Sequence, residues 1–156
     1  MAKLPIITYP NPILRQVTQP VLDVKKPILQ KLIKDMLETM EQNNGVGLAA
    51  PQIGQSLRLC VIRVEEITYI LVNPRVTYSS RKKETDIEGC LSFPEKFIAI
   101  QRPEQVRVKA LNELGMEVTL KTKGLLARAL QHEIDHLDGI VFIERVNKSK
   151  KIKSLV

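Results

Sequence analysis

The 156-residue chain contains no tryptophan, and aromatic residues make up only 4% of it. Aliphatic side chains must therefore fill most of the core. Only two cysteines are present, too few for a disulfide framework, so we expect free thiols. No apolar run approaches the ~20 residues of a membrane helix, and the N-terminus lacks the long apolar segment of a secretory signal. These absences predict a cytoplasmic protein.

Acidic residues are also in the minority, and the chain has a net charge of +7. The excess is partly local, because residues 147–156 contain four lysines and no acidic residue. Such a basic tail could contact nucleic acid or another anionic surface. The length and the 44% of hydrophobic residues suit one domain. We therefore predict a single domain over residues 1–156 that ends in the basic tail.

Hydrophobic spacing predicts one helix that begins at Pro27 and ends at "QNNGVG", and another from Gly124 to Gly139. Strands are predicted over residues 57–64, 68–74, 104–111 and 116–122, with a further candidate at 75–80. The sequence "NELG" joins two alternating strands as a hairpin. The pattern predicts an α+β fold, with a mainly antiparallel sheet around a buried helix, a helix in the N-terminal half and a short C-terminal helix. The basic tail is a candidate for that last helix.

Both histidines of the chain lie in "QHEIDHLDG", residues 131–139. His132 and His136 are four residues apart, so on a helix both rings point to one face and can bind one ion. Glu133 would lie beside that ion and could take a proton from an attacking water. The surrounding helix is apolar on all sides, which predicts burial, and buried imidazoles and carboxylates need partners. An accidental spacing of hydrogen-bonded histidines is the alternative.

A third metal ligand must come from upstream, because no third histidine exists and no downstream residue fits well. Cys60 lies in "LRLCVIRV", where a small apolar side chain suits a buried strand. Cys90 lies in "DIEGCLSFP", after a glycine and shortly before Pro94, which we expect to end any strand. Cys90 is therefore the candidate ligand. An ordinary buried thiol and a nucleophilic thiolate are its alternatives.

The segment "GVGLAAPQIG", residues 45–54, is not a phosphate-binding loop, because no Lys or Ser/Thr follows at the required spacing. Its glycines allow the backbone to approach another group closely. Gln52 is the only side-chain amide in this segment. It is either a surface or capping group or a donor toward a developing oxyanion.

The three segments "GVGLAAPQIG", "EGCLSFP" and "QHEIDH", in this order and spacing, resemble the peptide deformylases. "YPNPILRQVTQPV" and "GLLARALQHEIDHLDG" are also similar to that family, so the resemblance covers about residues 4 to 146. It implies a metal-dependent enzyme that hydrolyses the N-formyl group from the initiator methionine of new polypeptides. It also implies a cytoplasmic location, in a cell or a phage-infected host, or an organellar matrix.

The resemblance assigns roles to residues of this chain. Cys90, His132 and His136 would hold one divalent metal ion, Fe²⁺ natively, with Zn²⁺, Ni²⁺ or Co²⁺ able to replace it. Glu133 would be the general acid/base, and Gln52 and the backbone N–H of Leu91 would stabilise the oxyanion. The peptide would lie extended along a strand edge. The residues expected to line it are Val46, Gly47, Gly89 and Leu125.

Some features depart from the family pattern. Arg128 stands where some relatives have an aliphatic residue, so its alkyl stem is expected in the pocket wall. Phe97 replaces a basic residue of some relatives. The chain ends soon after the second helix, whereas many relatives continue into a helix that docks on the ribosome. Contact of the lysine tail with ribosomal RNA is therefore one expectation, and a solvated tail is the other.

Two other functions remain open from the residues alone. Another small metal-dependent hydrolase or peptidase could use the same ligands. A basic RNA-binding protein with a structural metal is less favoured, because no RNA-binding motif is present. We expect neither a membrane nor a specific DNA partner. Asp135 has no clear role, and we expect it to hold a histidine or a neighbouring cation.

Overall fold

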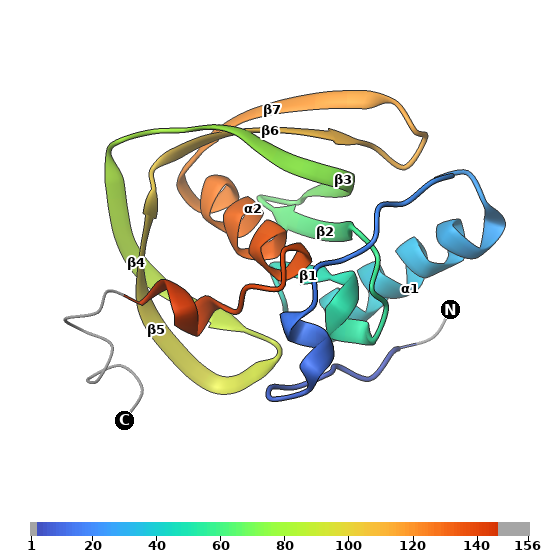
Figure 1. The fold of residues 1–156 in the computed structure, drawn as a ribbon, viewed down its shortest axis with the longest axis horizontal. Coiled ribbons are helices and arrows are strands. Elements are labelled where there is room, and N and C mark those ends of the chain that lie inside the picture. Colours follow the sequence, from blue (N-terminus) through green and yellow to red (C-terminus); the bar gives the residue numbers. More distant parts are fainter. Residues whose placement is uncertain (1–2, 147–156) are drawn as a thin grey trace.

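The computed structural model describes residues 3–146, and within them the strands form two antiparallel sheets that curve around one central helix, α2 (Figure 1). One sheet has five strands in the order β1-β2-β3-β6-β7, and the other pairs β4 with β5. The first sheet consists of β1 (Gly47–Ala49), β2 (Leu59–Val64), β3 (Ile67–Ser79), β6 (Gln105–Leu111) and β7 (Glu117–Lys123). The predicted α+β class and the predicted hairpin, which is β6–β7, are confirmed.

The strands predicted at 68–74 and 75–80 are one continuous strand, β3. The predicted boundary follows Pro74, and proline cannot donate a hydrogen bond to a neighbouring strand. The pairing with β6 is instead irregular between Val72 and Arg75, and Asn73 has a positive φ of 51°. An irregularity of this kind accommodates the proline within the strand.

The two-stranded sheet was not predicted. It consists of β4 (Lys83–Cys90) and β5 (Phe93–Pro103), which form a hairpin around Leu91 and Ser92. Pro94 lies inside β5 and does not end a strand there, contrary to the expectation. A strand start in a two-stranded sheet tolerates proline, because each strand has a partner on one side only.

Both predicted helices are present, as α1 (Pro27–Gln42) and α2 (Gly124–Leu137). All residues of α2 from Ala127 onward are buried, as its apolar circumference predicts. Short 3-10 helices occur at Pro12–Arg15, Ala50–Ile53 and Phe142–Arg145. The last is the short helix near the C-terminus, whereas the helix expected in the basic tail lies outside the described residues. None of the helices in residues 3–146 is long and apolar enough to cross a membrane.

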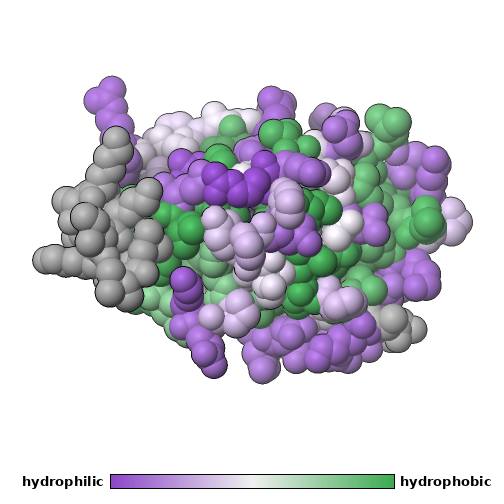
Figure 2. All heavy atoms as spheres, turned by 60° about the horizontal axis from the view of Figure 1, so that its bottom comes forward, coloured by the Kyte–Doolittle hydropathy of each residue, from purple (hydrophilic) through white to green (hydrophobic). Residues whose placement is uncertain are grey.

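Hydrophobic residues form three buried clusters. One joins the five-stranded sheet to α2 through residues such as Ile62, Leu71 and Leu130. A second lies between the sheet and α1, and a third joins β5 to the N-terminal segment and the last 3-10 helix. Hydrophobic side chains also reach the surface, and Figure 2 shows them among hydrophilic residues on one face. The first cluster is therefore the one that holds α2 against the five-stranded sheet.

Candidate metal centre

Cys90, His132 and His136 come together although two different elements carry them. The histidines lie one turn apart on α2, and Cys90 is the last residue of β4. One potential ligand atom from each of the three residues lies within 4.8 Å of the others. The Sγ atom of Cys90 is 3.3 Å from Nε2 of His136. Two imidazoles and a thiol are a suitable donor set for a divalent transition metal.

The surroundings of these groups fit a cation. Among the described residues, the buried Nδ1 of His136 and Oε1 of Glu133 have no hydrogen-bond partner. Burial and the neighbouring His132 lower the pKa of His136 well below its usual value, so this ring is neutral, as a ligand must be. The ring atom of His136 that faces Cys90 is Nε2, so Nε2 is the atom available to an ion. An unpartnered carboxylate oxygen is costly in a protein interior, and the charge of a divalent ion beside Glu133 would offset that cost.

The orientation of His132 is set by Glu88, because its Nδ1 lies 2.9 Å from Oε1 of that carboxylate. Nε2 is therefore the atom left for a ligand role, which is the usual arrangement of a metal-binding histidine. Burial disfavours the protonated ring, but hydrogen bonds with Cys90 and Glu88 raise the pKa of His132 above its usual value. A metal would have to displace that proton, so binding should release protons.

Glu133 is buried beside the backbone of Gly47. A Cβ atom on that glycine would lie 2.5 Å from Oε2 of Glu133, so only glycine leaves room for the carboxylate. Burial raises the pKa of Glu133 to about 7, although His132 lowers it. A carboxyl group with this pKa can accept and return a proton near neutral pH.

Gln52 is almost fully buried in the 3-10 helix Ala50–Ile53. Its Oε1 accepts a hydrogen bond from the Ala49 N–H at 2.9 Å, so its Nε2 must be the atom directed at Cys90 Sγ, 3.7 Å away. Nε2 also donates to Ser92 Oγ at 3.2 Å. Gln52 is therefore both a capping group and a donor at the centre, and Ser92 is a partner that the sequence analysis missed.

A cavity of about 620 Å³ opens beside these groups. Its lining includes every residue predicted to contact the peptide: Val46, Gly47, Gly89 and Leu125. Leu91, between β4 and β5, also lines it. The carbonyl of Val46 accepts a hydrogen bond from the Arg63 N–H at 2.8 Å, so that carbonyl is already engaged. Phe97 lies against Gly89, where an added Cβ would be 2.8 Å from its ring.

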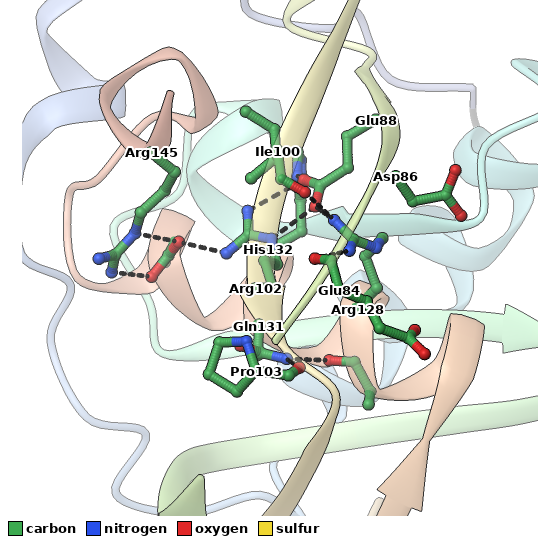
Figure 3. A network of polar contacts seen from close by, with 12 residues as sticks. Glu84, Asp86, Glu88, Ile100, Arg102, Pro103, Arg128, Gln131, His132 and Arg145 are labelled. Atoms are coloured by element: carbon green, nitrogen blue, oxygen red, sulfur yellow. Dashed lines mark hydrogen bonds and ion pairs between the residues drawn. The ribbon is translucent and has the colours of Figure 1, made fainter. Parts of the chain in front are cut away.

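A buried network of charges lies behind the centre (Figure 3). Glu88 binds Arg102 through two hydrogen bonds of 2.5 and 2.9 Å. Arg102 reaches on to Asp135 at 2.9 Å, and Asp135 binds Arg145 at 2.7 Å. Burial alone would raise the pKa of Glu88, but hydrogen bonds from His132 and Arg102 outweigh it and lower the pKa to about 2. Asp135 therefore holds neighbouring cations, which was one of its two expected roles.

The sequence analysis missed the part that Glu88 and Arg102 play. Neither residue was assigned a role from the sequence. The adjacency of Glu88 to "GC" was the only available signal. Arg128 lines the cavity, as expected, and its guanidinium also binds Glu88 at 2.6 Å.

Comparisons with known proteins agree with this geometry. The family model described as polypeptide deformylase matches residues 3–152. A peptide deformylase of Mesorhizobium japonicum is 45% identical over 152 residues, which cover 94% of this chain and 86% of the relative. The crystal structure of peptide deformylase from Thermus thermophilus is 44% identical, with a TM-score of 0.92, and the match covers 97% of this chain and 90% of that one.

A further structure is a Met-Ala-Ser-bound class I type b peptide deformylase from Acinetobacter baumannii. It is 34% identical, with a TM-score of 0.90 and coverage of 93% of this chain and 99% of that one. The family match spans nearly the whole chain, and the relatives are matched over most of their own length. The chain therefore belongs to the polypeptide deformylase family and is a hydrolase with a metal-binding site.

Proposed function

We propose that this chain removes the formyl group from N-formyl-methionyl peptides, with Glu133 as the proton carrier and Cys90, His132 and His136 as the metal ligands. The convergence of the three ligand atoms within 4.8 Å, beside a buried carboxylate, carries this proposal. A peptidase that uses the same ligands is the second candidate. The family match favours the deformylase.

One divalent ion fits the three donors, and we propose Fe²⁺ as the native metal, with Zn²⁺, Ni²⁺ or Co²⁺ able to replace it. A thiolate with two imidazoles accepts all of these ions, so the donor set alone does not distinguish them. When bound, the ion supplies Lewis acidity and lowers the pKa of a water molecule. Anaerobic purification followed by elemental analysis tests the assignment, and a stoichiometric metal other than iron would contradict it.

Glu133 takes a proton from the attacking water as the water oxygen bonds to the formyl carbon. Its carboxylate is confined between α2 and Gly47, so it can stay close to the reacting atoms. It then gives the proton to the amine nitrogen as the carbon–nitrogen bond breaks, and formate and a free N-terminus are the products. Burial raises the pKa of Glu133 to about 7 in the absence of an ion, and the charge of a bound ion would lower that pKa and favour the carboxylate that accepts the proton.

Gln52 and the Leu91 N–H donate hydrogen bonds to the formyl oxygen as negative charge develops on it. The Gln52 amide is fixed by Ala49 and Ser92, so little reorientation is needed during the reaction. Loss of one such donor typically lowers kcat about 10²- to 10³-fold. Gln52→Leu should show a loss of this size.

The peptide would lie extended between β1 and β4. β1 has a strand partner on one side only, so its other edge can pair with a substrate strand. Val46, Gly47 and Gly89 would supply backbone contacts, and Leu125 with the side chain of Val46 would form apolar walls for methionine. The structure of the relative from Acinetobacter baumannii has Met-Ala-Ser bound, which supports a short peptide as the ligand of this chain.

Formate release from formyl-Met-Ala-Ser tests the activity directly. Metal-loaded protein should release formate, and Glu133→Gln should lower the rate about 10²- to 10⁴-fold. Glu113→Gln, the same chemical change in the turn between β6 and β7, is the control. Absence of formate from metal-loaded protein would reject the deformylase, and cleavage of internal peptide bonds would favour the peptidase.

The cellular setting is the last part of the proposal. We place the enzyme in the cytoplasm, where the four lysines of residues 147–156 would contact ribosomal RNA. Contacts with phosphates weaken steeply as salt rises. Cosedimentation with ribosomes should therefore decrease between about 50 and 200 mM salt, and should disappear when the four lysines are replaced by glutamine. Salt-independent cosedimentation would contradict this contact.

A further inference from the structure

The β4–β5 sheet carries Cys90, and it joins the five-stranded sheet where β3 leads into β4 and β5 leads into β6. At this junction the Ser80 N–H donates to the Gln105 carbonyl and the Glu104 N–H donates to the Lys82 carbonyl, both at 2.9 Å.

Cys90 lies at the opposite end of the hairpin, where it pairs with Phe93. Two strands alone are only marginally stable, so the position of this end depends on what it docks against. Cys90 is the last residue of β4, whereas His132 and His136 lie on α2. The distance between Cys90 and the histidines is therefore set by how the hairpin is fastened to the helix.

Arg128 reaches from α2 to both strands of this hairpin (Figure 3). Its Nη1 donates to Glu88 Oε2 at 2.6 Å and to the Ile100 carbonyl at 2.9 Å. Its Nη2 donates to the Glu84 carbonyl at 2.9 Å. Glu84 and Glu88 belong to β4, and Ile100 belongs to β5. One buried guanidinium therefore spans the hairpin.

Arg128 also acts on the carboxylate that orients His132. The two oxygens of Glu88 accept four hydrogen bonds: Oε1 from Arg102 Nη2 and His132 Nδ1, and Oε2 from Arg102 Nε and Arg128 Nη1. The carboxylate is saturated, so each donor restrains its rotation. Glu88 is two residues before Cys90, so the same restraint reaches both elements of the metal centre.

We propose that Arg128 is a positioning residue that fastens the β4–β5 hairpin to α2 and thereby sets Cys90 and His132 at ligand distance. The inference rests on the proposed function, because it takes both residues as metal ligands. Lining the cavity would require only the alkyl stem of Arg128. The three hydrogen bonds of its guanidinium link the helix to both strands of the hairpin.

Cobalt-loaded protein tests the proposal without an activity measurement. The thiolate-to-cobalt charge-transfer band in the absorption spectrum reports the bond between Cys90 and Co²⁺. The rate of Co²⁺ transfer to a chelator reports how firmly the ligands hold the ion. Arg128→Met keeps the stem and removes the guanidinium, and it should release Co²⁺ about 10- to 100-fold faster, as loss of a group behind a metal ligand typically does. Arg128→Lys, with one nitrogen for three acceptors, should lie between Arg128→Met and the wild type.

Gln131→Met is the matched control. Gln131 also ties α2 to β5, through a 3.0 Å hydrogen bond to the Pro103 carbonyl, but it makes no contact with Glu88. It should lose stability in urea and keep a release rate within about twofold of the wild type, because the groups behind the ligands are intact. If Arg128→Met does not fold, the Co²⁺ release rate of Arg128→Lys is compared with that of Gln131→Met, and Arg128→Lys should be the faster of the two.

Two results would overturn the proposal: wild-type release from the foldable Arg128 variants, or equally fast release from Gln131→Met. A different result would contradict the proposed ligand set itself. Wild-type protein without any thiolate-to-cobalt absorption would remove Cys90 as a ligand, whatever the variants do.

Discussion

The five-stranded sheet packs on α2 through aliphatic side chains, whereas the β4–β5 sheet meets the same helix through buried charges. Leu71, Val108 and Leu130 represent the first contact. Arg102 with Asp135, and Arg128 with Glu88, represent the second. Apolar packing is non-directional, while hydrogen-bonded ion pairs fix the distance and angle between their elements. The β4–β5 sheet supplies Cys90, so the position of this thiol depends on the directional contacts.

The two cysteines follow the same division. Cys60 lies in β2 within the apolar cluster, and burial raises the pKa of its thiol well above the usual value. Cys90 lies at the end of β4, beside the histidines. The same residue type is thus a packing group in one sheet and a candidate ligand in the other.

The largest loss of stability is expected at the contact between the β4–β5 sheet and α2, which we call the charged side. Arg102→Met removes the shared partner of Glu88 and Asp135 and leaves two buried carboxylates with fewer cations. Breaking a buried pair in this way costs about 3 to 5 kcal/mol in the free energy of unfolding, and we expect the upper part of that range. Urea unfolding of the metal-free protein measures it. A cost below about 1 kcal/mol, typical of surface pairs, would contradict the comparison.

A substitution at the aliphatic contact between the five-stranded sheet and α2, which we call the apolar side, should lower stability without changing metal binding. Leu71→Ala creates a cavity in the cluster between the five-stranded sheet and α2, at a cost of about 2 to 5 kcal/mol. The Glu88 network does not include this residue, so the folded protein should release metal at the wild-type rate. Chelator competition below the unfolding transition measures this, and markedly faster release would show that apolar packing also sets the ligands.

Acid should weaken the charged side through Glu88. Its pKa in the folded protein is about 2, below its usual value of 4.5. A lowered pKa contributes stability above the unfolded-state value, and that contribution is lost as pH falls from about 4.5 toward 2. The shift corresponds to about 3 kcal/mol. In metal-free protein, Glu88→Gln should therefore flatten the loss of stability between about pH 5 and pH 2, and an unchanged slope would contradict this role.

The smallest effect is expected at an exposed ion pair of the five-stranded sheet. Arg63 in β2 binds Glu41 of α1 at 3.0 Å, with both side chains about half exposed. Solvent screens such pairs, so Arg63→Met should cost no more than about 1 kcal/mol. It is the same substitution as Arg102→Met, and similar unfolding free energies for the two variants would contradict the importance of burial.

Much of the apolar side could be predicted from the sequence. Ile33, Met36 and Met40 recur at helical spacing in α1, and Val106, Val108 and Ala110 alternate in β6. The ligand set could also be proposed, because both histidines lie on one helix and Cys90 is the cysteine outside an apolar strand.

The charged side could not be predicted in the same way. β4 reads "KETDIEGC", and its one buried residue is Glu88, so hydrophobic periodicity gives no signal. The partners of Arg102 lie 14 and 33 residues away in sequence, and only the folded chain brings them together. Arg128 occupies a buried position of α2, where the pattern of the helix would favour an apolar residue, so the pattern gives no signal for its hydrogen bonds.

Metal retention in two matched variants tests the central claim most directly. Cys90→Ser and Cys60→Ser make the same chemical change, one at the end of β4 and one in β2. After loading and gel filtration, Cys60→Ser should keep about one metal ion per chain, as expected for a structural thiol, and lose only stability. Cys90→Ser should lose its metal or change its metal preference. Full metal content with unchanged preference in Cys90→Ser would contradict the account.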